Sequence, residues 1–267
     1  MDDLIRNFRK NGLAFVPGAV SRESIDNLYM TIFILFKKAF PSFFSWGNNS
    51  IDAKIWNDQR FHDSIIDARK KDPIKFGAIY DSLQLTLAAK KILTDVNIIR
   101  LISKLFDTEL SNVSCRSSII RLDCPFDTKN SIDWHFDAIS TKNMKHLPED
   151  GISVNISFHE THPMHGSAHF LPGSHTGKHV QKVLNSNKNN ESDRYIVNEK
   201  VLKQFKSFQF SVLDIGDLVF FPMTMIHKSG ENSSSKVRIS GVFRFYKINS
   251  ESFIFQKEDI LDNDIEI

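Results

Sequence analysis

The segment Trp134-His135-Phe136-Asp137 combines the side chains of a metal site with the spacing of a strand. On an extended chain, residues i and i+2 point to the same side, so His135 and Asp137 can present an imidazole and a carboxylate to one point. These two groups form a partial ligand set for a divalent first-row metal, and one more histidine would complete a facial triad. The His-x-Asp pair alone is weak evidence for a metal site, because a surface histidine that forms a salt bridge with a nearby carboxylate gives the same pattern.

His227 is the candidate for the third ligand, and Arg238 strengthens its case. His227 follows an apolar stretch, 216–222, that is typical of a buried strand, where a histidine is more often packed than a ligand. Arg238 comes eleven residues later, on the next expected strand, and alternation places Ser240 on the same face. An arginine fork and a serine hydroxyl can together bind a carboxylate. The His-x-Asp pair, His227 and Arg238 together would arise by chance much less often than any one of them alone.

The order of these residues resembles the phytanoyl-CoA dioxygenase family, in which His-x-Asp is followed by a distant His and then by an Arg. Three further segments match family patterns. They are 8–18 (the F-x-x-x-G entry), 166–175 (GSAHFLPGSH, like N-G-x-L-x-x-x-P-G-S-H) and 216–221 (G-D-x-x-x-F). Two positions depart from the pattern, because His165 stands where Asn or Asp is usual and Phe136 where Gln is frequent. Neither departure touches the metal set.

The resemblance implies a fold, cofactors and an activity. The fold would be mainly β with flanking α, a double-stranded β-helix (jelly roll, cupin-like) with N-terminal helices packed outside. The cofactors would be Fe(II), 2-oxoglutarate and O2, with a small-molecule substrate hydroxylated while succinate and CO2 are released. Asp137 disfavours halogenation, since related halogenases carry a small residue there, and it favours hydroxylation or a related desaturation or cyclisation. The implied residues are His135, Asp137 and His227 for iron, Arg238 for the C5 carboxylate of 2-oxoglutarate, and Asn155, Ser118 and Tyr80 as further co-substrate contacts.

Two other function classes stay open. The first is a catalytically idle β-helix protein that binds a small ligand, which would have no need of a complete metal set together with Arg238. The second is a cupin-type metal enzyme that does not use 2-oxoglutarate, which would need the triad but not Arg238.

The first 110 or so residues have a helical pattern. Ser21 can cap a helix whose apolar residues recur with a 3.6-residue period as far as Phe36. Asp81, with Gln84 three residues on, resembles a capping box that starts a second helix, and Asp95 opens a third.

After residue 110 the apolar period changes from 3.6 to 2. The expected strands are 113–122, 152–158, 167–171, 208–213, 218–221 and 237–246. Many short strands after a helical start predict an antiparallel sandwich or barrel. We expect one domain over 1–267, with 1–110 as helical support and 111–250 as the β core. Segment 178–206, which contains the polar 185–193, is expected to be a lid-like insertion, and 231–236 a hairpin tip.

Composition and charge exclude several classes. Lys and Arg number 34 against 32 Asp and Glu, a net charge of +2 that argues against nucleic acid or an anionic membrane as the main partner. Cys115 and Cys124 match no zinc spacing and predict reduced thiols. With no apolar segment at the N-terminus, the sequence predicts a cytoplasmic protein. The histidines between 159 and 179 are expected on turns and strand ends, and His175 is expected to be structural.

Overall fold

The structure is a computed structural model that describes residues 1–46, 51–127, 131–137, 151–180, 197, 199–251, 253 and 255. The predicted lid segment 178–206 and its polar stretch 185–193 lie mostly outside these residues. Within them, no helix has the length and apolar character needed to cross a membrane.

Helices fill the N-terminal part of the chain, as predicted. The helix after Ser21 is confirmed, because the Ser21 hydroxyl accepts a hydrogen bond from the Ser24 N–H. The helix after Asp95 is confirmed in the same way, with Asp95 accepting from the Asn97 N–H. The elements are α1 (Asp2–Asn11), α2 (Arg22–Ala39), the 3-10 turn η1 (Ala53–Asn57), α3 (Gln59–Lys71), α4 (Pro73–Gln84), α5 (Leu87–Leu93), α6 (Val96–Phe106), the 3-10 turn η2 (Leu110–Asn112) and the later α8 (Glu199–Leu202).

The predicted helix start at Asp81 is wrong. Asp81 lies inside α4, which begins at Pro73 with Asp72 as its cap, and Thr86 caps the next helix instead. Gln84 serves another purpose, because its side-chain amide donates to the Ile120 carbonyl (3.0 Å) and accepts from the Ile120 N–H (2.7 Å). The residue that completed the capping-box pattern, Gln84, therefore joins its helix to the strand that contains Ile120.

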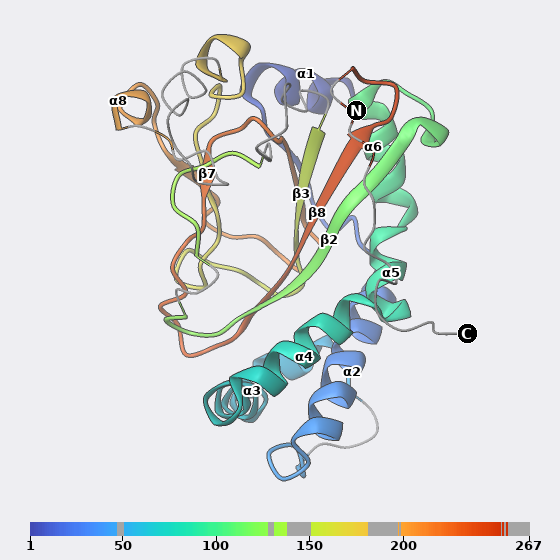
Figure 1. Ribbon diagram of the computed structural model, residues 1–267, viewed down its shortest axis with the longest axis vertical. Coiled ribbons are helices and arrows are strands. Elements are labelled where there is room, and N and C mark those ends of the chain that lie inside the picture. Colours follow the sequence, from blue (N-terminus) through green and yellow to red (C-terminus); the bar gives the residue numbers. More distant parts are fainter. Residues whose placement is uncertain are drawn as a thin grey trace, which may run out of the picture.

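The strands form two antiparallel sheets. The five-stranded sheet has the order β1-β6-β3-β8-β2, and the three-stranded sheet the order β5-β4-β7. The strands are β1 (Ala14–Val16), β2 (Val113–Asp123), β3 (Gly151–Ser157), β4 (His169–Phe170), β5 (Phe208–Gln209), β6 (Leu218–Pro222), β7 (His227–Lys228) and β8 (Arg238–Lys247). Two strands, β4 and β5, are shorter than predicted, and β1 and β7 were not predicted. Helix α4 packs against β2, while β7 lies across from the central strands (Figure 1). The predicted double-stranded β-helix with helices outside is confirmed.

Segment 231–236 is not the tip of a hairpin. The strand before it, β7, pairs with β4, whereas the strand after it, β8, pairs with β2 and β3. The segment therefore carries the chain from one sheet to the other. Asn232 holds this crossing in place by donating to the carbonyls of Asp123 (3.0 Å) and Lys236 (2.8 Å).

One hydrophobic cluster joins the helices to the five-stranded sheet. The helices contribute Phe36, Phe61 and Ile102, which are fully buried. They share this cluster with Ile120 and Phe243 from strands. Burying such large apolar side chains is the main stabilising contribution to a domain of this size. The helices therefore cover one face of the sheet and leave its other face toward the three-stranded sheet. The prediction that residues 1–267 form a single domain stays a prediction.

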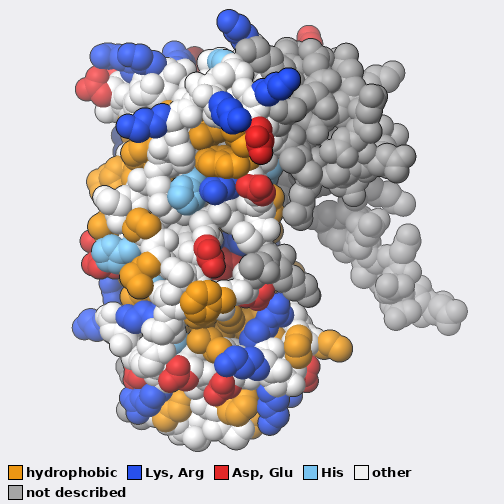
Figure 2. Space-filling view, turned by 90° about the vertical axis from the view of Figure 1, so that its left-hand side faces the viewer, with side chains coloured by type: hydrophobic (Ala, Val, Ile, Leu, Met, Phe, Trp, Pro, Cys, Tyr) orange, Lys and Arg blue, Asp and Glu red, His pale blue; other side chains and the backbone are white. Residues whose placement is uncertain are grey.

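The face that carries the three-stranded sheet shows acidic and basic side chains mixed with apolar ones over its described part (Figure 2). This mixture is what a net charge of +2 predicts for a surface without a strong bias toward either sign.

Candidate functional site

The structure brings together the three residues of the predicted triad. His135 and His227 form an isolated antiparallel bridge, in which each backbone N–H donates to the carbonyl of the other residue at 2.9 Å. His227 begins β7, so this bridge fixes the His-x-Asp segment against the three-stranded sheet. Asp137 follows two residues after His135, and all three residues are at most 8% exposed. Backbone pairing thus places groups that are far apart in the sequence at one point.

The imidazole rings are oriented by their own backbone. Nδ1 of His135 donates to the Asp133 carbonyl (2.7 Å), and Nδ1 of His227 donates to the Met225 carbonyl (2.9 Å). This leaves each Nε2 facing Asp137, at 3.8 Å from Oδ1 for His135 and from Oδ2 for His227. Among the described residues, these three form the group whose potential ligand atoms all lie within 4.8 Å of one another. Two imidazole nitrogens and one carboxylate are a donor set that suits a divalent iron.

The electrostatics keep all three groups in the form that binds a metal. Burial lowers the pKa of His135 to about 3, and the neighbouring His227 acts in the same direction. Burial also lowers the pKa of His227. Burial by itself would raise the pKa of Asp137, but the Arg244 guanidinium and then His227 hold it well below its usual range. Near neutral pH the site therefore offers two neutral imidazoles and an ionised carboxylate.

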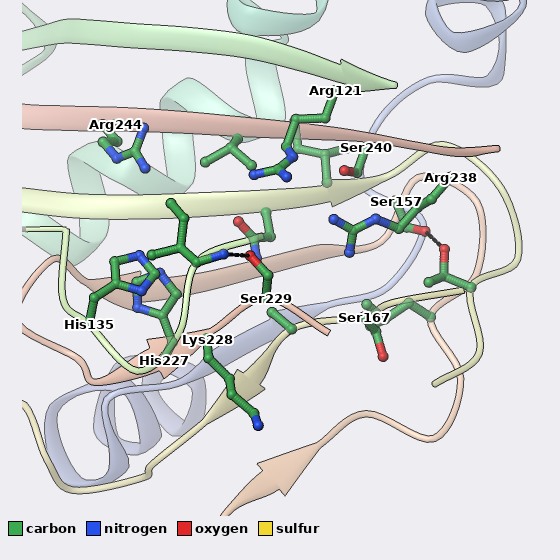
Figure 3. A pocket seen from close by; sticks show the side chains of 17 residues that line it. Arg121, His135, Ser157, Ser167, His227, Lys228, Ser229, Arg238, Ser240 and Arg244 are labelled. Carbon is green, nitrogen blue, oxygen red and sulfur yellow. Dashed lines mark hydrogen bonds between the residues drawn. The ribbon is translucent and has the colours of Figure 1, made fainter. Parts of the chain in front are cut away.

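A cavity opens beside the triad, between the two sheets. One wall is β8, whose alternation directs Arg238, Ser240 and Arg244 into the cavity, and the sequence predicted the shared face of Arg238 and Ser240. Arg121 of β2 also lines it. In the view of Figure 3, Arg244 lies nearest to His135 and His227, Arg238 lies farthest from them, and Arg121 lies between. The cavity thus runs from the triad along a row of three guanidinium groups.

Arg238 and Arg121 share one carboxylate. Arg238 donates to Asp123 Oδ2 from Nε (3.1 Å) and Nη2 (2.6 Å), and it also donates to the Gly166 carbonyl. Arg121 donates to Asp123 Oδ1 from Nη2 at 2.9 Å. Burial would raise the pKa of Asp123, but Arg238 and then Arg121 lower it below its usual range. Two cations against one anion leave a positive charge at this end of the cavity, which favours a second carboxylate.

The other predicted co-substrate residues divide into two groups. Ser240 and Asn155 line the cavity together with Arg238. Ser118 and Tyr80 are not among its lining residues. Ser118 lies three residues before Arg121 on β2, so alternation puts the two side chains on opposite faces of the strand. Tyr80 of α4 packs against the main hydrophobic cluster, where burial raises its pKa to about 12. The roles of all four in binding a co-substrate stay predictions.

The histidines between 159 and 179 occupy turns and strand ends rather than the triad. His159 stacks on Trp56 with ring centroids 4.0 Å apart, and His169 lies on β4. The Pro-Gly-Ser-His turn has a structural part beside the triad, because the Ser174 hydroxyl accepts from the Ile226 N–H (2.9 Å), next to His227. His175 contacts the Arg9 carbonyl through Nε2 (3.2 Å), a contact between the turn and α1.

Sequence reasoning missed Asp123, Arg121 and Ser153, and it assigned no role to Arg244. Ser153 donates from Oγ to Asp137 Oδ2, and Arg244 donates from Nη2 to Asp137 Oδ1, both at 2.7 Å. Alternation along β8 puts Arg244 on the same face as Arg238 and Ser240, which is the one signal that the sequence offers for it. Arg121 and Asp123 lie two residues apart on β2, so the i, i+2 spacing could have found their pair. The pairs Ser153–Asp137 and Asp123–Arg238 join residues that are far apart in the sequence, and no local pattern reports such pairing.

Solved structures resemble this chain in fold. The epimerase SnoN, solved in complex with Fe3+, alpha ketoglutarate and nogalamycin RO, gives a TM-score of 0.58 at 15% identity, over 92% of this chain and 83% of that one. The alpha ketoglutarate dependent carbocyclase SnoK from nogalamycin biosynthesis gives 0.53 at 14%, over 92% and 84%. EctD from S. alaskensis, solved with 2-oxoglutarate and 5-hydroxyectoine, gives 0.53 at 16%, over 92% and 76%. No curated protein sequence matches the chain.

The family comparison agrees with the site. The sequence profile of the phytanoyl-CoA dioxygenase (PhyH) family matches residues 8–240, which include the triad and Arg238. The donor set fits the Fe(II) of this family, because two neutral imidazoles and an ionised carboxylate converge in a buried position. The positive end of the cavity fits the anionic co-substrate 2-oxoglutarate. The chain therefore belongs to the phytanoyl-CoA dioxygenase family, and it is an oxygenase that depends on Fe(II), 2-oxoglutarate and O2.

Proposed function

We propose that this protein hydroxylates a small molecule at an iron held by His135, Asp137 and His227, with 2-oxoglutarate anchored by Arg238. The observation that carries the proposal is the convergence of both Nε2 atoms on the Asp137 carboxylate at the head of an arginine-lined cavity. Fe(II) with 2-oxoglutarate and O2 supplies an oxidant that can attack an unactivated C–H bond. The protein orients these groups and excludes water from them.

The charges of the cavity support an anchored co-substrate. Arg238 is the guanidinium farthest from the triad in Figure 3, so a dicarboxylate could reach from the iron toward it. Asp123 already holds Arg238 in place, which fixes the fork before a ligand arrives. Ser240 and Asn155 line the same cavity and can complete the polar contacts.

Hydroxylation is the outcome that Asp137 favours over halogenation, since the carboxylate occupies a position that a halide would need. The structural neighbours include an epimerase and a carbocyclase, so the same fold supports other outcomes at iron. The SnoN and EctD structures were solved with the small molecules nogalamycin RO and 5-hydroxyectoine, respectively. We therefore propose a small-molecule substrate for this chain as well.

Titration of 2-oxoglutarate into the anaerobic Fe(II) protein tests the proposal. We expect a weak visible metal-to-ligand charge-transfer band that saturates with one co-substrate per iron. A metal enzyme that does not use 2-oxoglutarate would bind iron without this band, and an idle ligand-binding protein would bind neither. Either outcome would refute the assignment. A screen for compounds that stimulate succinate formation, with the products analysed by mass, then separates a gain of one oxygen atom from a change without it.

A further inference from the structure

We propose that Ser153 and Arg244 form a two-point clamp that sets the orientation of the Asp137 carboxylate and thereby determines how tightly the site binds its metal. The clamp rests on the proposed role of Asp137 as a metal ligand. Neither residue would itself contact the metal, so both are positioning residues.

The clamp is built into the middle of the five-stranded sheet. Ser153 of β3 and Arg244 of β8 are direct cross-strand partners, and β3 and β8 are neighbouring inner strands. Ser153 is also paired with Phe221 of β6 and is 0% exposed. Residues opposite each other on paired strands hold their side chains at a fixed separation, so the two donors cannot move independently.

The two donors bind different oxygens of one carboxylate. Ser153 Oγ donates to Oδ2 and Arg244 Nη2 to Oδ1, both at 2.7 Å. Two bonds to separate oxygens fix the plane of the carboxylate as well as its position, which a single bond would not. Each oxygen then faces one imidazole, at 3.8 Å from Nε2 of His135 or His227.

Asp137 needs such support more than the histidines do. It lies outside the named strands, whereas His135 and His227 are bridged to each other through their backbones and have their rings oriented by nearby carbonyls. Outer partners that orient a ligand commonly change metal affinity by about 10- to 100-fold. The clamp gives Asp137 the orienting partner that the local backbone gives each histidine.

The charge of Arg244 acts in the opposite direction to its orienting effect. A guanidinium close to the site repels a divalent cation, so removing the positive charge alone should tighten metal binding. Removing the orienting bond should weaken it. This opposition separates a positioning role from a purely electrostatic one, because the two predict changes of opposite sign.

The experiment measures Co(II) affinity of the metal-free protein by calorimetry without 2-oxoglutarate. We compare Arg244→Met, Arg244→Lys and Ser153→Ala with Arg121→Met, a charge-matched control whose guanidinium binds Asp123 instead of Asp137. We expect Arg244→Met to weaken Co(II) binding about 10-fold or more and Ser153→Ala by a smaller factor. Arg121→Met should bind Co(II) as tightly as wild type or more tightly. Arg244→Lys should recover part of the loss, and the Co(II) d–d absorption spectrum should change in Arg244→Met.

Several results would overturn the clamp. One is tighter Co(II) binding by Arg244→Met, equal to that of Arg121→Met, because Arg244 would then act through charge alone. Another is wild-type affinity in folded Ser153→Ala, which decides the question even if Arg244→Met does not fold by near-UV circular dichroism. Wild-type protein that binds no Co(II) would overturn the proposed metal site itself, and the clamp with it. Normal wild-type binding with unchanged variants would overturn only the clamp.

Discussion

Two groups of buried histidines in this molecule differ in how their ring nitrogens are used. At the triad, His135 and His227 each bind a backbone carbonyl through Nδ1 and turn Nε2 toward Asp137. Around Trp56, His62 and His159 use both nitrogens for structure. His62 donates from Nε2 to the Trp56 carbonyl (2.6 Å) and accepts from the Val237 N–H (3.0 Å). His159 donates from Nδ1 to the Glu160 carbonyl (2.8 Å) and accepts from the Ile239 N–H (3.1 Å).

Burial and pKa do not distinguish these two groups. Burial lowers the pKa of His62 to about 4 and that of His159 to about 3, similar to the effect on His135. The distinguishing feature is that each triad histidine keeps one ring nitrogen, Nε2, directed at other potential metal ligands. A buried neutral histidine is therefore a ligand candidate when one ring nitrogen has no protein partner and a carboxylate lies opposite it.

The structural group has its own task near the cavity. His62 accepts a hydrogen bond from the Val237 N–H, and His159 accepts one from the Ile239 N–H. Val237 and Ile239 flank Arg238 at the start of β8. Trp56 donates from Nε1 to the Val237 carbonyl (3.0 Å). The helical layer thus fixes the strand end from which Arg238 reaches into the cavity.

Replacing a triad histidine should have the largest effect. His227→Ala removes a ligand, so we expect Fe(II) binding to be lost and turnover to fall by more than the 10- to 100-fold typical of outer partners. Asp137→Ala should behave in the same way. Metal content after reconstitution and succinate formation measure both effects.

The matched variant is His159→Gln in the structural group. It should retain metal binding and lose stability instead, because glutamine loses the ring stack on Trp56 and cannot reproduce both hydrogen bonds by which the imidazole bridges the Glu160 carbonyl and the Ile239 N–H. Loss of metal from folded His159→Gln, or normal hydroxylation by Asp137→Ala, would break the distinction between the groups.

Arg238→Met should have the next largest effect. Truncating one partner of a buried, hydrogen-bonded charge pair costs about 2–5 kcal/mol, so affinity for 2-oxoglutarate should fall about 30-fold or more. Titration of the charge-transfer band measures this affinity. Co(II) binding should be retained, since Arg238 contacts Asp123 rather than the triad. Unchanged affinity for 2-oxoglutarate would remove Arg238 from the co-substrate site.

Acid should destabilise the protein through the structural group. His62 and His159 are neutral in the folded state, while in the unfolded chain their pKa is about 6.5, so the unfolded state takes up protons first as pH falls. The free energy of unfolding should therefore be fully retained above pH about 6.5 and fall toward pH about 4, by up to about 1.4 kcal/mol per pH unit for each histidine.

His62→Gln should flatten this pH dependence. Denaturant unfolding of the metal-free protein at pH about 6 and about 4.5, between the folded and unfolded pKa values of His62, measures how steeply the free energy of unfolding depends on pH. A slope equal to that of wild type would show that His62 does not stay neutral in the folded protein.

Lys236→Met should give the smallest effect. The Lys236 ammonium lies 4.0 Å from the centroid of Trp56, a cation–π contact worth about 0.5–1 kcal/mol at a partly exposed site. Thermal unfolding at neutral pH should show a loss of this size, with metal affinity unchanged. Lys236 also lowers the pKa of His62, so the loss should shrink in acid. A large loss that grows in acid would contradict this reading of the contact.

Local patterns predicted much of the candidate site and part of the fold. The alternation along β8 survives folding, because a strand fixes the direction of each side chain. His135 and Asp137 lie outside the named strands, and there the backbone bridge between His135 and His227 holds the segment in place. The helix starts at Ser21 and Asp95 were predictable because a cap binds backbone only two or three residues away. The start at Asp81 failed because Asp72 and Pro73 gave the stronger signal. Strands β1 and β7 are too short to show a period of two.

The sequence by itself determined which residues are candidates for the proposed metal site and on which face of β8 the arginine lies, since both depend on residue type and short-range geometry. The tertiary structure decided the partners. Asp123 binds Arg238, and Ser153 with Arg244 binds Asp137, because strand order and register set which side chains meet. It also decided which histidines direct a ring nitrogen at Asp137. The acceptor role of His159 depends on Ile239, a residue that only the folding of β8 brings to it.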